Sequence, residues 1–315
     1  MEVHHSTSFL GLEPPLTDLE DSEVVLLPVP FERTTSYGKG TAGGPTALLE
    51  ASQYVELYDE ELDHDLDDHR IATLPAFLPR SQDLASALGE IEEAAAEQLA
   101  AGRFLVTLGG EHSLSIAPIR AARRLLAEGD EPLGVLQFDA HADLRDDYEG
   151  TPHSHACVMR RVHDLGLPIA AVGLRALSRP EGDLIRRDRI PVIWGHELEA
   201  LDDHFDALLA ALPDTVYLTF DIDYFDPSLV PATGTPEPGG GFWNPTLRCL
   251  RKLFASKRVV AMDVVELAPH PGSAASDFVA AKLVAKCLAY RRVGQVATSG
   301  PEDPAPGLDG APRNG

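Results

Sequence analysis

Short apolar segments recur along the chain and alternate with longer segments that have a helical pattern of hydrophobic residues. The short segments are apolar at successive positions, which is typical of strands buried on both faces of a sheet. Eight such strands are predicted, over residues 23–30, 70–77, 104–108, 133–138, 169–173, 191–194, 216–220 and 258–262. Helices are predicted between and after them, over residues 46–51, 83–101, 114–128, from about 154 onward, 180–187, 198–212 and 276–291.

This alternation of strands and helices predicts an α/β fold. We expect a three-layer αβα architecture, in which an eight-stranded, mostly parallel, doubly wound sheet is covered by helices on both faces. An eight-stranded closed barrel is the alternative. At 315 residues the chain is short enough for a single domain. That domain is expected over residues 1–297, and the segment 298–315, rich in proline and glycine, is expected to be a disordered tail.

The chain is acidic, with 50 aspartate and glutamate residues against 26 lysine and arginine residues and a net charge of −24. This charge argues against a nucleic-acid partner, because phosphates would be repelled over most of the surface, and it suits a small cationic ligand. No apolar run approaches the roughly 18 residues of a membrane span, and the first residues lack the pattern of a signal peptide. We therefore expect a cytoplasmic protein that does not bind membranes. Three widely spaced cysteines predict neither a disulfide framework nor a zinc site.

Two segments look like binding motifs but are interpreted otherwise. Residues 38–43 fit the pattern G-x-G-x-x-G, yet about seven residues separate them from the preceding predicted strand. A dinucleotide fingerprint follows its strand directly, so this segment is interpreted as a connecting or active-site loop. Residues 56–68 contain eight carboxylates without regular ligand spacing, and they are interpreted as a solvated surface segment.

Carboxylates and imidazoles come directly after three of the predicted strands. After the strand at 133–138, a carboxylate, an imidazole and a second carboxylate occupy alternate positions, so they share one face if the backbone stays extended. Two carboxylates with the same spacing end the strand at 216–220, and an imidazole follows the strand at 104–108. Parallel sheets build ligand sites at the carboxyl ends of their strands, so we expect these side chains to converge. The six candidate ligands are His112, Asp139, His141, Asp143, Asp221 and Asp223.

This set of side chains predicts a site for two metal ions. Four carboxylates and two imidazoles offer more donors than one structural zinc ion uses, and the absence of thiolates favours ions such as Mn²⁺. In a two-metal site the ions lie about 3.5–4 Å apart and generate a nucleophile from water. Two divalent cations balance the four carboxylates, and no arginine clamp for phosphate accompanies them. A cationic substrate such as a guanidinium compound fits this charge better than a phosphate ester.

With these motifs the chain resembles the ureohydrolases, the family of arginases and agmatinases, which are dimanganese enzymes of α/β fold. The likeness lies in GGEHS (109–113), FDAHAD (138–143), SHACVMRR (154–161), FDIDYFDP (220–227), PATGTPEPGG (231–240) and MDVVELAP (262–269). These motifs span most of the chain. The segment 27–45 and the motif at 231–240 are more similar to agmatinases than to arginases.

The resemblance implies a role for each residue of the site. One Mn²⁺ ion would be held by His112, Asp139, Asp143 and Asp221, and the other by Asp139, His141, Asp221 and Asp223. Asp139 and Asp221 would therefore bridge the ions. His155 matches the family's proton-shuttling histidine, Glu266 the carboxylate that orients the guanidinium group, and Asp223 a carboxylate that stabilises the tetrahedral intermediate. Asp226 is interpreted as a structural turn residue.

One position bears on the substrate. Arginases usually carry an asparagine where this chain has Arg145, and that asparagine receives the α-carboxylate of arginine. Agmatine lacks this carboxylate, so the resemblance favours hydrolysis of agmatine to putrescine and urea, in the service of polyamine biosynthesis. Aminopropylagmatine, arginine and guanidinobutyrate are alternatives with the same chemistry. Arg145, His155 and Glu266 are expected to contact the substrate.

Two rival interpretations need other features. A cysteine nucleophile would pair Cys157 with His155, but residues two apart on a helix do not face one another. A non-catalytic member of the fold would be marked by lost ligands, whereas all six are present. The resemblance also implies a homo-oligomer, either a trimer or a hexamer.

Overall fold

The computed structural model describes residues 8–299, with side chains up to residue 294. Its main sheet has eight strands in the order β4-β1-β5-β10-β9-β6-β7-β8, and every neighbouring pair is parallel. The strands are β1 (Val24–Val29), β4 (Ile71–Thr73), β5 (Phe104–Gly109), β6 (Leu133–Phe138), β7 (Ile169–Leu174), β8 (Val192–Trp194), β9 (Thr215–Asp221) and β10 (Arg258–Val265). Because β4 and β8 are free edges, the predicted open sheet is confirmed and the barrel is wrong.

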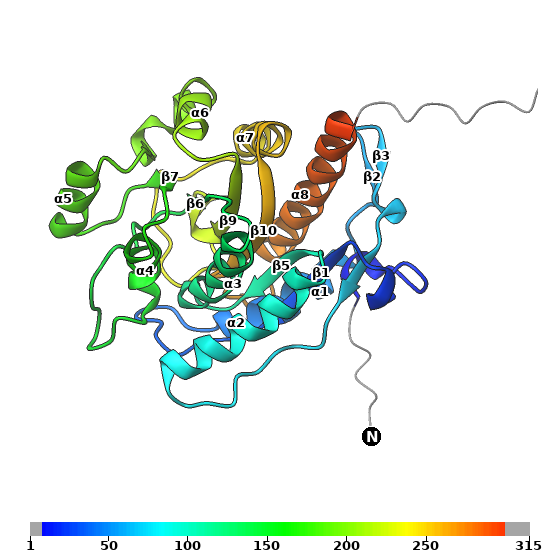
Figure 1. Ribbon diagram of the computed structural model, residues 1–315, viewed down its shortest axis with the longest axis horizontal. Coiled ribbons are helices and arrows are strands. Elements are labelled where there is room, and N and C mark those ends of the chain that lie inside the picture. The colour runs from blue at the N-terminus through cyan, green and yellow to red at the C-terminus, as the bar shows by residue number, and fades with distance from the viewer. Residues whose placement is uncertain (1–7, 300–315) are drawn as a thin grey trace, which may run out of the picture.

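Helices cover both faces of this sheet, so the predicted three-layer architecture is also confirmed (Figure 1). On one face lie α1 (Gly44–Ser52), α6 (Leu201–Ala210), α7 (Trp243–Ser256) and α8 (Ala275–Ser299). On the other lie α2 (Leu84–Ala100), α3 (Ile116–Ala127), α4 (Val158–Asp164) and α5 (Arg179–Asp188). Successive strand residues point to opposite faces. In β5, for example, Phe104 and Val106 pack into one hydrophobic core, and Leu105 packs into the other.

No helix is predicted from the sequence over the residues of α7. This helix packs on the sheet through residues at helical spacing, among them Leu247, Leu250 and Leu253. Pro245 lies in its first turn, where a proline costs no intrahelical hydrogen bond. The leucines at helical spacing that indicate this helix were therefore already visible in the sequence.

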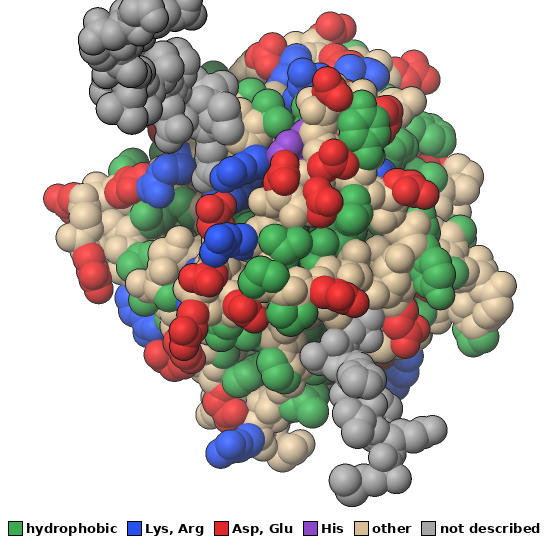
Figure 2. All heavy atoms as spheres, turned by 90° about the vertical axis from the view of Figure 1, so that its right-hand side faces the viewer, with side chains coloured by type: hydrophobic (Ala, Val, Ile, Leu, Met, Phe, Trp, Pro, Cys, Tyr) green, Lys and Arg blue, Asp and Glu red, His purple; other side chains and the backbone are tan. Residues whose placement is uncertain are grey.

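The acidic segment at 56–68 lies at the surface, as the sequence predicted, with seven of its eight carboxylates exposed. It forms a short antiparallel hairpin of β2 (Tyr58–Asp59) and β3 (His64–Asp65), and Asp59 is buried. Lys286 of α8 places its Nζ 2.9 Å from Asp59 Oδ1 and 3.0 Å from Glu61 Oε2. The hairpin is thus anchored to α8 by a buried cation. Figure 2 shows the side of the molecule that carries the hairpin and α8, where acidic side chains are spread among basic and hydrophobic ones.

The last helix reaches beyond the predicted domain end. It runs to Ser299 and so includes the first two residues of the segment predicted as a tail, whereas residues 300–315 lie outside the described part of the chain. Within the described residues, none of the helices has both the length and the apolar composition needed to cross a bilayer.

Candidate metal centre

The four central strands bring the predicted ligands to one end of the sheet. These strands are neighbours in the order β5-β10-β9-β6, and all are parallel, so their carboxyl ends meet. His112 follows β5 in a 3-10 turn, Asp221 ends β9, and Asp139 follows β6. Two residues here, Asp143 and Glu266, have positive φ angles of 51° and 64°. Such backbone is sparsely populated for residues other than glycine and is held in place by surrounding structure.

Three carboxylates surround one ring nitrogen of His112. Its Nδ1 lies 3.0 Å from Asp143 Oδ2, 3.1 Å from Asp139 Oδ2 and 3.4 Å from Asp221 Oδ2. All four side chains are buried. This arrangement matches the first predicted ligand set.

The other ring nitrogen of His112 indicates how the ring is protonated. Thr219 has one hydroxyl proton, which it donates to Asp263 Oδ1 at 2.7 Å, so its oxygen must accept from His112 Nε2 at 2.9 Å. Nδ1 therefore faces the three carboxylates. Burial opposes a charge on the ring, but the neighbouring Asp139 and Asp143 raise the pKa of His112 well above its ordinary value, so without a metal ion Nδ1 carries a proton toward them. A cation, either this proton or a metal ion in its place, must lie between Nδ1 and the carboxylates. A metal-binding histidine typically donates its second N–H in this way, so the residues fit a metal ion.

A second cluster shares Asp139 with the first. His141 Nδ1 lies 2.9 Å from Asp223 Oδ2 and 3.7 Å from Asp139 Oδ1. The geometry therefore offers two groups of candidate ligands, one with His112, Asp139 and Asp221 and one with Asp139, His141 and Asp223. Asp139 belongs to both, as expected of a bridging ligand. The bridging role of Asp221 stays a prediction, since its Oδ1 accepts a hydrogen bond from the N–H of Asp223 at 2.9 Å.

The carboxylates repel one another in this buried site. Burial, together with the charges of Asp143 and Asp223, raises the pKa of Asp139 to about 7. Burial and the charges of Asp223 and Asp139 likewise raise the pKa of Asp221 well above its ordinary value. For Asp223, burial also opposes ionisation, but the neighbouring His141 lowers its pKa to about 2. Positive charge is therefore needed to keep all these carboxylates ionised together.

Glu266 lies beside the cluster without joining either group. Its Oε1 accepts a hydrogen bond from the N–H of His112 at 2.6 Å. Burial raises its pKa well above the ordinary value, and the charge of Glu111 adds to this. Glu266 lines the same cleft as Asp223 and His155, which is where a carboxylate that orients a substrate must lie.

His155 is held on the cleft wall by a chain of hydrogen bonds. It begins a 3-10 turn (His155–Cys157), and its N–H donates to Thr34 Oγ1 at 3.0 Å. Thr34 in turn donates to Glu111 Oε1 at 2.7 Å. Glu111 is fully buried and also accepts the backbone N–H groups of Arg33 and Thr34 at 2.6 Å each. Burial raises the pKa of the neighbouring Cys157 thiol to about 11, so this residue is a poor nucleophile at neutral pH.

Arg145 lies at the mouth of the cleft. Its side chain is 41% exposed, its guanidinium carbon lies 5.0 Å from the ring centre of Tyr148, and its Nε lies 3.9 Å from Glu181 Oε2. Glu181 also accepts hydrogen bonds from the N–H of Ser178, where it caps α5, and from the N–H of Leu144. The cationic side chain is thus held to the rim, and its contact with substrate stays a prediction.

Several residues of the site were missed by the sequence analysis. These residues hold ligand or cleft residues by hydrogen bonds or line the cleft, but they lie outside the carboxylate and imidazole positions that alternate after the strands. They are Thr34, Glu111, Gln137, Arg175, Glu237 and Asp263. Gln137, for example, donates to Asp139 Oδ2 at 2.7 Å from within β6. A polar residue inside an otherwise apolar strand was the available signal, and it also marks Asp263 in β10.

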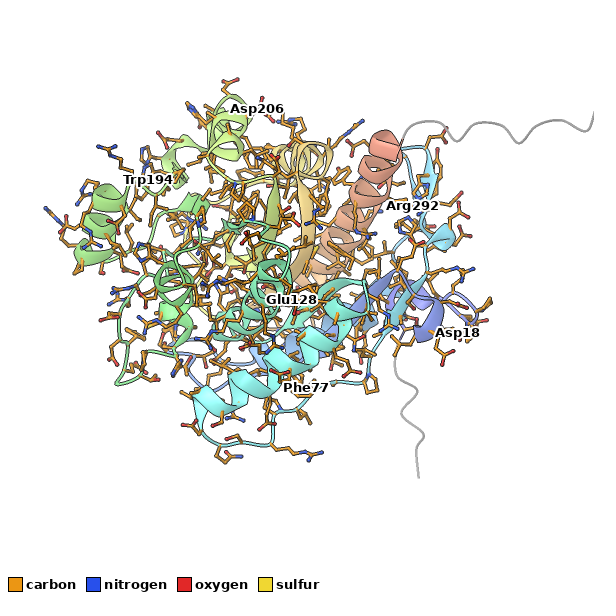
Figure 3. All side chains as sticks on the ribbon, in the orientation of Figure 1. Asp18, Phe77, Glu128, Trp194, Asp206 and Arg292 are labelled. Carbon is orange, nitrogen blue, oxygen red and sulfur yellow. The ribbon has the colours of Figure 1, made fainter. Side chains whose placement is uncertain are left out.

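The cleft has a volume of about 270 Å³, and its walls contain ligands from both clusters together with Glu266, His155 and Arg145. A larger cavity of about 740 Å³ lies toward Trp194 and contains none of the predicted ligands. Figure 3 labels Trp194 on the side of the molecule that carries α5. The smaller cleft is the functional candidate, because it contains the convergent polar groups.

Comparison with known proteins agrees with this α/β fold and its candidate two-metal site. The sequence profile of the arginase family matches residues 22–289. The N(1)-aminopropylagmatine ureohydrolase of Synechocystis sp. is 43% identical over 282 residues, which cover 87% of this chain and 91% of that protein. The agmatinase of Pyrococcus horikoshii is 35% identical over 277 residues, covering 87% and 93%. The crystal structure of the agmatine ureohydrolase of Thermoplasma volcanium superposes with a TM-score of 0.79 at 28% identity, covering 88% of this chain and 92% of that one.

The chain therefore belongs to the arginase family. It is a ureohydrolase, a hydrolase that acts on the C–N bonds of amidines. The resemblance inferred from the motifs is confirmed at the level of the family. Relatives named for aminopropylagmatine and for agmatine are both present, so the substrate is considered separately.

Proposed function

We propose that the chain cleaves the guanidinium group of N(1)-aminopropylagmatine, releasing urea and spermidine, with two Mn²⁺ ions at the candidate metal centre. The observation that carries this proposal is the arrangement around His112. Its Nε2 hydrogen is donated to Thr219, so its Nδ1 is directed at three buried carboxylates. Oxygen-rich ligands with imidazoles and without thiolates support Mn²⁺ as the ion.

The choice of substrate rests on relatives and on charge. The sequence motifs favour agmatine, but relatives at 43% and 36% identity are named for N(1)-aminopropylagmatine. This compound differs from agmatine by an aminopropyl group, so it is longer and carries one more ammonium group. Glu237 lines the cleft and forms no ion pair with the described residues, so its carboxylate is available to a distal ammonium group.

Agmatine is the second candidate. The agmatinase of Pyrococcus horikoshii and the solved agmatine ureohydrolase support it. Agmatine, which is shorter, would use the same cleft and the same contacts with Glu266 and His155. Arginine is disfavoured because its carboxylate would enter a cleft in whose lining acidic side chains outnumber the single arginine, Arg145.

In the proposed reaction, bound divalent ions supply a nucleophile from water at neutral pH. Glu266 uses one oxygen to hold the N–H of His112. Its second oxygen has no partner among the described residues and accepts a hydrogen bond from the guanidinium group. Water adds to the guanidinium carbon, the bond from this carbon to the alkylated nitrogen breaks, and a proton carried by His155 reaches the departing amine. Thr34 and Glu111 keep His155 on the cleft wall during this transfer.

A substrate panel tests the proposal. Urea release is measured with Mn²⁺-loaded protein on N(1)-aminopropylagmatine, agmatine, arginine and guanidinobutyrate. We expect kcat/KM to be highest for N(1)-aminopropylagmatine and lowest for the two compounds that carry a carboxylate. A kcat/KM for agmatine that equals or exceeds that for the longer compound would make agmatine the substrate. Urea release from neither would refute the proposed reaction.

The assembly is a separate prediction. A homo-oligomer, either a trimer or a hexamer, is expected from the resemblance to ureohydrolases. Sedimentation equilibrium of the Mn²⁺-loaded protein tests this expectation, and a monomer at micromolar concentration would contradict it.

A further inference from the structure

Arg175 directs its entire guanidinium group at backbone oxygens beside the candidate metal centre. The residue follows β7 and is half-buried. Its Nη2 donates to the carbonyl oxygens of Asp223 and Glu237 at 2.8 Å each. Further donor contacts reach the carbonyl oxygens of Gly173, Tyr224, Phe225 and again Glu237, at 3.1, 3.3, 3.4 and 3.2 Å. Among the described residues, no carboxylate lies within ion-pair distance of this guanidinium group.

These contacts join three separate segments of the chain. The first is the end of β7, the second is the turn after β9 that carries Asp223, and the third is the loop at 231–241 that carries Glu237. The turn and the loop are also tied to each other, because Gly241 donates its N–H to the carbonyl of Tyr224 at 2.9 Å. Arg175 thus adds a side-chain cross-link between a candidate metal ligand and a wall of the cleft, and it is the contact that also joins them to the end of β7.

The surrounding chain approaches this side chain closely at two glycines. A Cβ atom on Gly195 would lie 2.9 Å from Arg175 Cβ, and one on Gly240 would lie 2.6 Å from Arg175 Nη2 and 2.5 Å from backbone atoms of Asp226 and Tyr224. All these distances are shorter than atoms tolerate. The guanidinium group is therefore enclosed by backbone that fits it closely, unlike a surface arginine that rests against solvent.

We propose that Arg175 is a positioning residue that holds Asp223 at the second ligand group and Glu237 on the cleft wall. Asp223 has little freedom to move, since its Oδ1 accepts from the N–H of Ala140 at 3.1 Å and its Oδ2 lies 2.9 Å from His141 Nδ1. Releasing its carbonyl would let the turn shift and would separate the carboxylate from His141. This inference rests on the proposed function for its effect on substrate, but its effect on metal binding is independent of turnover.

The planar guanidinium group of arginine is needed for this role. It presents five N–H donors in fixed directions and so reaches carbonyl groups from three segments. Lysine keeps the charge but concentrates three donors on one atom, and methionine keeps only the length and apolar stem. We expect Arg175→Lys to be impaired nearly as much as Arg175→Met. Gly195→Ala displaces the stem of Arg175 without changing any charge, so it should produce a milder form of the same defect.

The experiment measures metal binding and kinetics in the full chain. Mn²⁺ binding to the metal-free protein is followed by isothermal titration, and the unfolding temperature of the metal-free protein is measured beside it. In Arg175→Lys and Arg175→Met, the affinity for one of the two ions should fall by about 10–100-fold, as when a supporting partner of a ligand is lost. KM for N(1)-aminopropylagmatine should rise as Glu237 loses its position. Arg187→Met is the matched control, because Arg187 is exposed and, among the residues that the structure describes, pairs with Asp188 alone.

The outcomes separate the possibilities. Selective loss of one ion, with an unfolding temperature close to that of the wild type, supports the positioning role. Wild-type affinity for both ions in Arg175→Met overturns it, as does equal loss of both ions together with a lowered unfolding temperature. If Arg175→Met does not fold, Gly195→Ala decides by the same criteria. If the wild type binds two ions but releases no urea, the proposed function fails while the titration still tests Arg175.

Discussion

Replacing Thr34 by valine removes a hydroxyl group that connects a buried carboxylate to His155. The hydroxyl donates to Glu111 Oε1 at 2.7 Å and accepts from the N–H of His155 at 3.0 Å. Valine has nearly the same shape, so the change deletes these two hydrogen bonds and a longer contact, at 3.3 Å, with His155 Nδ1, with little effect on packing. The backbone N–H groups of Arg33 and Thr34 still bind Glu111 after the change.

The size of the effect follows from the two bonds. The bond to the carboxyl group of Glu111 is worth about 1.5–3 kcal/mol, and we expect a loss of this size in the free energy of unfolding. The bond to His155 is between neutral groups and is worth about 0.5–1.5 kcal/mol. If the whole free energy of this bond serves to orient His155 in the transition state, kcat falls by about 2- to 13-fold, because 1.4 kcal/mol corresponds to a factor of ten.

Steady-state urea release, metal analysis and denaturant unfolding together test this prediction. Thr34→Ser keeps the hydroxyl and serves as the control, with kcat and stability close to those of the wild type. Both variants should retain two Mn²⁺ ions per chain, since Thr34 contacts no candidate ligand in the two clusters. Unchanged kcat in Thr34→Val, or loss of metal in that variant, would refute the role given to this hydroxyl.

Three other perturbations have defined outcomes. Lys286→Met leaves the buried carboxylate of Asp59 without its cation, so the free energy of unfolding should fall by about 3–5 kcal/mol in urea denaturation. Lys286→Met combined with Asp59→Asn should recover part of this loss. Burial, with the charges of His64 and Arg292, lowers the pKa of His69 to about 4, and Figure 3 labels Arg292 on α8. Folding favours the neutral ring of His69, so its contribution to the free energy of unfolding is present above pH 6.5 and is lost as the pH falls toward 4. Between pH 7 and pH 5 the free energy of unfolding of the wild type should therefore fall by about 2 kcal/mol more than that of His69→Gln. The same dependence of this free energy on pH in the two proteins would contradict the prediction. Finally, Asp139→Ala should lose metal whereas His155→Ala should keep both ions and lose most turnover, and equal metal loss in the two would refute the separate roles.

The sheet and the main ligands were predictable because their signals are local. Strands such as β5 and β6 are short apolar runs, and Asp139 and Asp221 directly follow or end such runs. In a parallel sheet this position alone places a side chain at the functional end. The order of the strands was not needed to find the ligands, although it explains why they converge.

The supporting contacts were not predictable for a physical reason. Thr34 and His155 are separated by 121 residues, and Thr34 and Glu111 by 77, so no local pattern relates them. Arg175 acts on backbone carbonyl groups, which every residue has and which no sequence motif marks. The anchoring of the acidic hairpin was not predictable because the cation that neutralises Asp59 comes from Lys286, 227 residues away.

The central claim is that two metal ions, held by groups that share Asp139, are required for urea release. Its most direct test is a titration of metal-free protein with Mn²⁺ while urea release from N(1)-aminopropylagmatine and from agmatine is followed. We expect no urea release after thorough chelation, and a rate of urea release that rises with added Mn²⁺ and reaches its plateau at two ions per chain. Activity that survives chelation, or that is complete at one ion per chain, would contradict this claim.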